Sequence, residues 1–271
     1  MIEVKSAKIG YVNSDKRSKN ETIIFEDISC NIEKGKLYCI LGANGVGKTT
    51  LFRTVLGFIP LLGGEILIDD KKSSAFSRKE LARKIAYVPQ YHTPPFPYSV
   101  MEIVLMGRGA YIDTFSSPSD KDRIKAESVL EKLGILHLKN SIYTRLSGGE
   151  RQLVLIARAL VQETDYLFMD EPGANLDYGN QIKMLKILKE LSDNGIGICF
   201  TTHSPEHAIL CNANVISVVN RQKLIQGPAN EVISDKLLKE MYGIDTVVKV
   251  EKVDYEYRHI IMPVFNNKKI L

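Results

Sequence analysis

Tryptophan is absent from this chain of 271 residues, and neither sign of charge is in large excess. The net charge is only +4, and the lysine pairs Lys71-Lys72 and Lys268-Lys269 are typical of a solvent-exposed surface. Proteins that bind nucleic acid usually gather positive charge on one face and stack bases on aromatic rings. We therefore expect no nucleic-acid partner.

Cysteine is scarce, and its four occurrences lie far apart in the sequence. No C-x-x-C pair occurs among Cys30, Cys39, Cys199 and Cys211. Cys39 and Cys199 lie in apolar segments, where a thiol behaves as a small hydrophobic group. The pattern favours a reducing compartment and argues against a structural zinc site.

Long apolar runs are also missing. No stretch reaches the roughly 18 apolar residues that a membrane-spanning helix needs. The first residues, Met1 to Lys5, lack the apolar core of a signal peptide. We therefore expect a soluble protein, long enough for one large α/β domain or two small ones, which reaches a membrane only through a partner.

What is present is an alternation of strand-like and helix-like segments. It predicts an α/β fold with a mostly parallel sheet and helices on both faces. Strands are expected at residues 5–11, 21–32, 37–41, 64–69, 86–90, 166–169, 197–201 and 215–219, with a polar loop at 13–20. Helices are expected at residues 48–56, 78–85, 181–192, 205–211 and 231–242.

A helical block interrupts the alternation. Three prolines within residues 91–98 forbid regular structure there, and the pattern of residues 99–162 is helical. We therefore predict a helical insertion at about residues 91–162. The expected helix-capping residues in it are Ser99, Glu102, Ser119, Asp122 and Gly134.

Residues 42–49 match the phosphate-binding pattern G-x-x-x-x-G-K-[ST] at every fixed position. Glycines with positive φ let several backbone N–H groups point at phosphate oxygens. Lys48 can reach the β- and γ-phosphates, and the Thr49 hydroxyl can bind Mg²⁺. The helix that follows places its positive end under the phosphates. The expected nucleotide contacts are Gly42, Asn44, Gly45, Gly47, Lys48, Thr49 and Thr50.

Two carboxylates, Asp170 and Glu171, end the apolar strand at residues 166–169. A strand end beside a phosphate loop is where the Asp that holds Mg²⁺ belongs. Glu171 can polarise the attacking water as a general base. The pair predicts hydrolysis of the bound nucleotide.

A third motif, residues 146–152, precedes a predicted helix. Its Ser147, Gly148 and Gly149 can hold an anion at the helix N-terminus. The string Leu146-Ser147-Gly148-Gly149-Glu150-Arg151-Gln152 resembles the signature motif of the ATP-binding cassette (ABC) superfamily. The resemblance covers the chain to about Gly243 and implies a phosphate-loop NTPase core, an N-terminal antiparallel β subdomain and an inserted helical subdomain.

The resemblance also implies roles for isolated residues. Gln90 corresponds to the glutamine that contacts Mg²⁺ and senses the γ-phosphate, and His203 to the histidine that holds the attacking water. Glu171, His203, Gln90 and Lys48 would form the catalytic set, and Thr49, Gln90 and Asp170 the metal ligands.

Two further residues are assigned by resemblance. Asp177, with Asn175 and Leu176, matches the loop that connects two nucleotide sites, although Gly173 stands where family members often carry Thr or Ser. Tyr11 resembles the aromatic residue that stacks on adenine.

For the whole protein, the resemblance implies a pair of subunits with two ATP molecules and Mg²⁺ sandwiched between them. Each ATP would lie between the 42–49 loop of one copy and the 146–152 motif of the other. ATP would join the subunits, and hydrolysis would let them part. The expected partners are a second copy, an integral membrane permease and, indirectly, an extracytoplasmic substrate-binding protein. The expected place is the cytoplasmic face of the membrane.

The segments 97–108 and 174–181 resemble the ATPase subunits of importers of iron chelates, haem and cobalamin. A zinc or manganese importer is the nearest alternative. A soluble non-transport ABC ATPase and a small-molecule kinase belong to other classes. Residues 90–111 are the expected docking surface for the membrane subunit, and residues 244–271 form a tail whose role is open.

Overall fold

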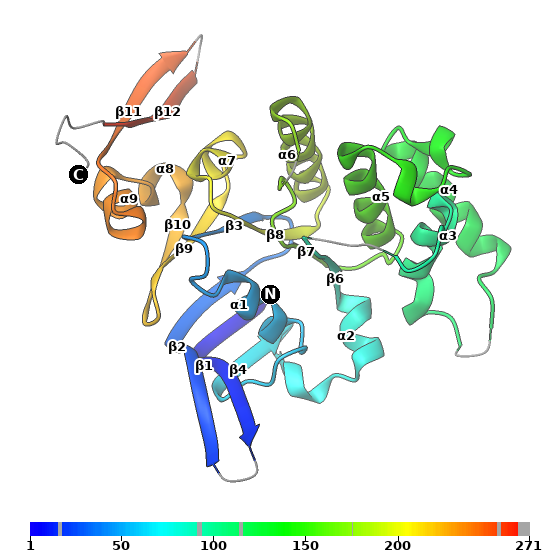
Figure 1. Cartoon of the computed structure of the whole chain (residues 1–271), viewed down its shortest axis with the longest axis horizontal. Helices are drawn as coiled ribbons and strands as arrows, with labels where there is room; N and C mark the ends of the chain where they lie inside the picture. Colours follow the sequence, from blue (N-terminus) through cyan, green and yellow to red (C-terminus); the bar gives the residue numbers. More distant parts are fainter. Residues whose placement is uncertain (16–17, 91–93, 114–115, 175, 254–255, 265–271) are drawn as a thin grey trace.

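Two sheets form the centre of the computed structural model, which describes residues 1–15, 18–90, 94–113, 116–174, 176–253 and 256–264 (Figure 1). The strands of the larger sheet are β3 (Leu37–Leu41), β6 (Ile85–Val88), β7 (Tyr166–Met169), β8 (Gly197–Thr202), β9 (Asn214–Asn220) and β10 (Lys223–Pro228). Their order is β10-β9-β3-β8-β7-β6. Every pair is parallel except β9 with β10, which confirms the mostly parallel sheet.

The smaller sheet is antiparallel and comes from the first quarter of the chain. Its strands are β1 (Ile2–Asp15), β2 (Ser18–Ile32), β4 (Gly63–Ile68) and β5 (Lys71–Lys72), in the order β2-β1-β4-β5. The prediction of a loop at residues 13–20 is wrong, because the β1–β2 pairing continues to Asp15 opposite Ser18. Backbone hydrogen bonds between two strands form whether the side chains are polar or apolar, so the polar residues here can continue the pairing. Figure 1 shows this end of the hairpin projecting from the body of the molecule.

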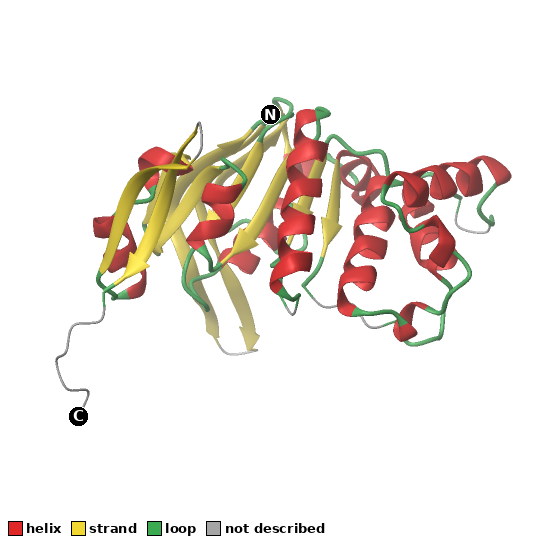
Figure 2. Ribbon diagram, turned by 90° about the horizontal axis from the view of Figure 1, so that it is seen from above, coloured by secondary structure: helices red, strands yellow, loops and turns green. Residues whose placement is uncertain are grey.

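The central strands are apolar on both faces, and the two faces have different covers. Leu37, Cys39 and Leu41 of β3 pack against α6 (Tyr178–Asp193), α7 (Pro205–Leu210) and α9 (Asp235–Tyr242). Figure 2 shows α6 and α7 in front of the strands of the larger sheet. Tyr38 and Ile40 face α1 (Lys48–Val55) and, around it, the smaller sheet. The second face is therefore covered by one helix and a sheet, not by helices alone.

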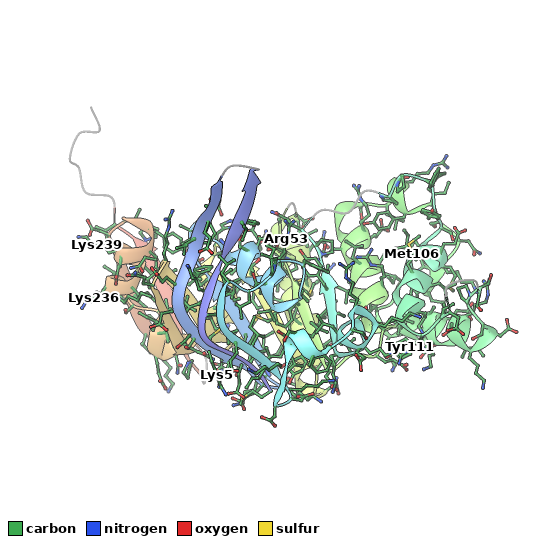
Figure 3. The ribbon with its side chains drawn as sticks, turned by 90° about the horizontal axis from the view of Figure 1, so that it is seen from below. Lys5, Arg53, Met106, Tyr111, Lys236 and Lys239 are labelled. Carbon is green, nitrogen blue, oxygen red and sulfur yellow. The ribbon has the colours of Figure 1, made fainter. Side chains whose placement is uncertain are left out.

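The helical block lies between β6 and β7 in sequence. Both predicted capping boxes, Ser99 with Glu102 and Ser119 with Asp122, are present. Figure 3 shows Met106 and Tyr111 at the surface of this block. Residues 91–93 lie outside the described residues. The helices of the block are α3 (Val100–Leu105), η2 (Met106–Ala110), α4 (Asp120–Lys132), η3 (Leu136–Leu138), η4 (Tyr143–Arg145) and α5 (Gly148–Leu160). Two further helices, η1 (Ser73–Ala75) and α2 (Arg78–Lys84), lie between β5 and β6.

The C-terminal part differs from its prediction. A single helix was expected at residues 231–242, but α8 (Ala229–Val232) ends first and α9 starts anew. The reason is Ser234, whose side chain accepts a hydrogen bond from Leu237 N and caps α9. The chain then forms a hairpin of β11 (Thr246–Val253) and β12 (Glu256–Pro263). Among the described residues, no helix has the length and apolar character to cross a bilayer.

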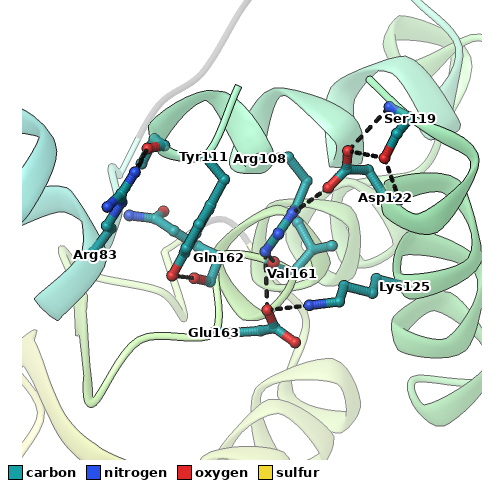
Figure 4. A network of polar contacts seen from close by, with 10 residues as sticks. Arg83, Arg108, Tyr111, Ser119, Asp122, Lys125, Val161, Gln162 and Glu163 are labelled. Atoms are coloured by element: carbon teal, nitrogen blue, oxygen red, sulfur yellow. Dashed lines mark hydrogen bonds and ion pairs between the residues drawn. The ribbon is translucent and has the colours of Figure 1, made fainter. Parts of the chain in front are cut away.

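A buried arginine holds the helical block where it joins the sheet (Figure 4). Arg108 Nε donates to Asp122 Oδ1 at 2.8 Å, and its Nη1 donates to Val161 O at 2.9 Å and Glu163 Oε2 at 3.0 Å. The guanidinium carbon lies 4.1 Å from the ring centroid of Tyr111. Arg108 therefore ties η2 and α4 to the turn that leads from α5 into β7.

Asp122→Asn tests how much this ion pair stabilises the fold. The Ser119 hydroxyl, followed by the Arg108 guanidinium, lowers the pKa of Asp122 to about 2. A lowered pKa stabilises the fold at neutral pH, and this contribution is lost as pH falls towards 2. We expect Asp122→Asn to reduce the free energy of unfolding by about 2 kcal/mol at pH 7 and by about half as much at pH 3.

Urea denaturation at both pH values measures the difference. Asp120→Asn is the matched control, because Asp120 is an exposed acid in the same helical turn. A loss for Asp122→Asn that is the same at pH 7 and pH 3 would contradict this assignment.

Candidate functional site

The phosphate loop (residues 42–49) connects β3 to α1 and depends on its glycines. Gly47 has φ +112° and Gly45 has φ +77°. A Cβ at Gly47 would lie 2.5 Å from Ile24 Cγ2, and one at Gly42 would lie 2.9 Å from Val46 Cγ1. Such distances are shorter than any tolerable contact between carbon atoms. The loop therefore needs glycine for both its conformation and its packing.

Lys48 lies buried at the mouth of this loop. Its Nζ donates to the carbonyl oxygens of Gly42 at 2.8 Å and Ala43 at 3.1 Å, and lies 3.8 Å from Glu171 Oε1. Burial lowers the pKa of Lys48, and the carboxylates of Glu171 and Asp170 oppose that shift. The ammonium group is thus held at the start of the loop by two loop carbonyl oxygens, where it can make a charge-assisted contact with a bound phosphate.

The two acids at the end of β7 each contact a second predicted site residue. Thr49 Oγ1 donates to Asp170 Oδ1 at 3.2 Å, and Gln90 Nε2 donates to Glu171 Oε2 at 3.1 Å. The Thr49 hydroxyl and the Asp170 carboxylate are oxygen donors of the kind that Mg²⁺ accepts together with phosphates. Glu171 has φ +44°, an uncommon value that other contacts must maintain.

His203 follows β8 and completes this group. Its Nδ1 lies 3.7 Å from Glu171 Oε2, and its side chain is 57% exposed. Glu171 is therefore surrounded by Lys48, Gln90 and His203, from three different segments. The structure brings together all four residues predicted to be catalytic.

Thr201 is a site residue that the sequence analysis missed. Its hydroxyl donates to Asp170 Oδ1 at 2.7 Å and accepts from the Glu171 N–H at 2.8 Å. The side chain is fully buried in β8. One hydroxyl thus holds the Asp170 carboxylate and the backbone of Glu171, whose φ is unusual. A polar residue in the otherwise apolar segment 197–201 was the available signal.

Tyr11 lies beside the helix that follows the phosphate loop. Its hydroxyl is 3.2 Å from Thr50 Oγ1, and the residue is 41% exposed. An exposed ring at this place can accept a flat base next to the loop. The adenine contact stays a prediction.

The signature residues Ser147, Gly148 and Gly149 lie at the N-terminus of α5, next to the start of α6. Ser147 Oγ donates to Glu150 Oε2 at 2.7 Å within a capping box. A Cβ at Gly149 would lie 3.1 Å from Asn180 Cγ, so a larger residue would push against α6.

Asp177 is held by the same asparagine. Asn180 donates from its backbone and side chain to the two Asp177 oxygens, at 2.8 and 2.7 Å. Asn175 of the predicted connecting loop lies outside the described residues. At Gly173, a Cβ would lie 3.4 Å from Met184 Cε, which is an ordinary contact distance. Lack of space for a Cβ therefore does not explain why glycine stands here in place of Thr or Ser.

The structure does not bring the signature residues to the phosphate loop of the same chain. Figure 1 draws α5 among the helices on one side and α1 near the centre of the molecule. Across the described part of the chain, the bonds of Ser147 stay within its own helix turn. In a single copy, the signature residues and the phosphate loop are therefore separate.

Comparison with known proteins shows the family of this chain. Residues 25–174 match the family model described as ABC transporter. An uncharacterized ABC transporter ATP-binding protein of Haemophilus influenzae is 38% identical over 89% of each chain. An ABC transporter assigned to the metal-chelate type, solved in an inward-facing conformation, is 29% identical, has a TM-score of 0.83 and covers 97% of each chain.

Relatives with named substrates are less similar and differ among themselves. The hemin import ATP-binding protein of Hahella chejuensis is 34% identical over 84% of this chain and 90% of its own. A manganese transport system ATP-binding protein of Bacillus subtilis is 34% identical over 81% and 86%. The molybdate import ATP-binding protein of Haemophilus influenzae is 34% identical over 83% of each chain.

Thr201→Val tests the role of the shared hydroxyl. The change keeps the shape of the side chain but leaves the partly buried Glu171 N–H without its acceptor. We expect a loss of about 1–3 kcal/mol in the free energy of unfolding. Thr54→Val is the control, since the buried Thr54 hydroxyl donates to the Thr50 carbonyl within α1 and not to a site residue. If urea denaturation gave an equally small loss in the free energy of unfolding for both variants, Thr201 would not hold this strand end.

Proposed function

The chain belongs to the ABC transporter family, and from that premise we propose that it is the ATP-hydrolysing subunit of an importer for an iron chelate, haem or cobalamin. The observation that supports hydrolysis is that Lys48, Gln90 and His203 all contact Glu171 beside the phosphate loop. We assign residues 1–243 to the ATP-binding domain, with a helical insertion at about 91–162.

Each side chain of the group has a task that its position supports. Glu171 accepts the proton of the attacking water, because it is the carboxylate that the other three residues surround. Lys48 compensates phosphate charge, and Gln90 and His203 orient the water with their N–H groups. Thr49, Asp170 and Gln90 would hold Mg²⁺, which when bound neutralises charge on the β- and γ-phosphates.

A second copy would supply the missing half of each site. The phosphate loop and the signature residues are separate in one chain, whereas two copies related by a two-fold axis can place each loop against the other's Ser147, Gly148 and Gly149. ATP would then be held by both subunits, and hydrolysis would weaken their association. Neither copy would hydrolyse ATP efficiently alone.

The cargo is proposed from similarity to other importers. The hemin import relative and the solved metal-chelate type transporter support an iron chelate, haem or cobalamin. The manganese relative supports the second candidate, import of free zinc or manganese. In either case the membrane subunit and an extracytoplasmic binding protein would contact the cargo, and this chain would act at the cytoplasmic face.

The proposed contact with the membrane subunit lies on residues 90–111. Phe96 is 62% exposed and its ring meets Tyr98 edge to face at 5.9 Å, while Met106 is also exposed. Exposed aromatic and methionine side chains are enriched at protein interfaces. Gln90 at one end of the segment contacts Glu171, so a partner bound here is linked to the hydrolysis site.

Glu171→Gln tests the proposed catalytic role. Removing the base leaves Lys48 and the loop amides in place, so ATP should still bind while turnover falls at least about 100-fold. The ATP-bound pair should then accumulate, which light scattering after gel filtration with Mg-ATP measures as a doubled mass.

Glu190→Gln is the control, because Glu190 is exposed on α6 away from the acids of β7. Wild-type turnover in Glu171→Gln would refute the role. Turnover that requires an acceptor other than water would favour a kinase instead.

Phe96→Glu tests the docking segment. A buried charge should prevent co-purification of the membrane subunit from detergent extracts and abolish uptake, with ATP binding unchanged. Ile124→Glu changes another exposed apolar residue of the helical block, 66% exposed on α4, and should assemble normally. If both variants assemble, or if Phe96→Glu melts far below wild type, the surface is misplaced.

A further inference from the structure

A hydrogen bond from the C-terminal part of the chain reaches the catalytic group. Tyr242 Oη donates to the backbone oxygen of His203 at 3.1 Å, across 39 residues of sequence. Tyr242 is the last residue of α9, and its half-buried ring packs against the main core. Burial raises the pKa of Tyr242, so the phenol keeps the proton that it donates.

The His203 imidazole is largely exposed and is not held by close packing. Its side chain is 57% exposed, and the ion-pair contact of its ring is with Glu171 at 3.7 Å. A cavity of about 280 Å³ borders both residues, so open space adjoins the ring. Because side-chain packing does not fix the imidazole, its position depends on the backbone that carries it.

That backbone is a short turn between β8 and α7. Thr202, the last residue of β8, uses its Oγ1 to accept from Ser204 N at 3.1 Å and to contact His207 Nδ1 of α7 at 3.0 Å. These bonds span at most five residues, and neither of them involves His203 itself. Tyr242 differs because it belongs to another helix, so its bond ties the turn to the body of the protein.

The helix α9 can provide such a tie. Leu237, Leu238 and Met241 are buried in the core that also contains the central strands. Gly243, with φ +70°, ends the helix directly after Tyr242. Asp235 of α9 also accepts a bond from Val248 N in the C-terminal hairpin, at 2.5 Å. The hairpin and the His203 turn are thus attached to the same helix.

We propose that Tyr242 is a positioning residue for hydrolysis, holding the His203 carbonyl and thereby placing the imidazole beside Glu171. The inference rests on the proposed function, in which His203 orients the attacking water. It gives α9 a direct effect on the catalytic rate, although no residue of α9 is expected to touch the nucleotide. A movement of α9 would reach His203 through one hydrogen bond.

Tyr242→Phe is the test, because it removes the hydroxyl and keeps the ring. With purified full-length protein, we expect kcat for ATP to fall about 3- to 10-fold, with KM within about twofold of wild type. Tyr166→Phe is the matched control. It also removes a hydrogen-bonded hydroxyl, to Asp69 at 3.4 Å, but at the opposite end of the sheet. Both variants should melt within a few degrees of wild type.

A second measurement does not depend on turnover. The ring signals of His203 in an NMR spectrum, identified by their loss in His203→Ala, should shift in Tyr242→Phe and stay unchanged in Tyr166→Phe. A kcat equal to that of Tyr166→Phe, or unmoved His203 signals, would overturn the role of Tyr242. A wild type that binds ATP without hydrolysing it would refute the proposed function instead, while the NMR shift would still report whether Tyr242 places His203.

Discussion

Parallel pairing of β8 with β3 and with β7 is the constraint on which the candidate site depends. Leu41 is paired with Thr202, and Met169 with Phe200, so these strands end within two residues of one another. Strands that run in the same direction open their following loops at one edge of the sheet. The phosphate loop, the pair of acids and His203 therefore meet, although up to 161 residues separate Gly42 from His203. Thr201 completes this arrangement, because its hydroxyl bonds the Asp170 carboxylate and the Glu171 backbone N–H across the β7–β8 pair.

The sequence predicts well those features whose causes lie within a few residues. The capping boxes at Ser99 and Ser119 need only four consecutive residues, and the phosphate loop needs eight. Both are confirmed as local structure. The break between α8 and α9 is also locally encoded, by the Ser234 cap, although the prediction of one helix at residues 231–242 did not take that cap into account.

Features that depend on distant partners were not predictable in this way. Thr201 has a role only because the Asp170–Glu171 strand end lies beside it, 30 residues away in sequence. The Arg108 network and the Tyr242 bond join segments that no spacing rule connects. The extension of β1 to Asp15 depends on its pairing with β2, since the polar side chains there suggested a loop.

We propose that one copy holds two half-sites, and this arrangement is tested most directly by mixing two inactive variants, Lys48→Ala and Ser147→Arg. Each damages a different half, so a mixed pair contains one doubly damaged site and one intact site. Equimolar mixing should restore ATP turnover to about a quarter of the wild-type rate, if pairs form at random and sites act independently. If each chain instead contained a complete site, the mixture would be as inactive as its components, and the shared-site account would be wrong.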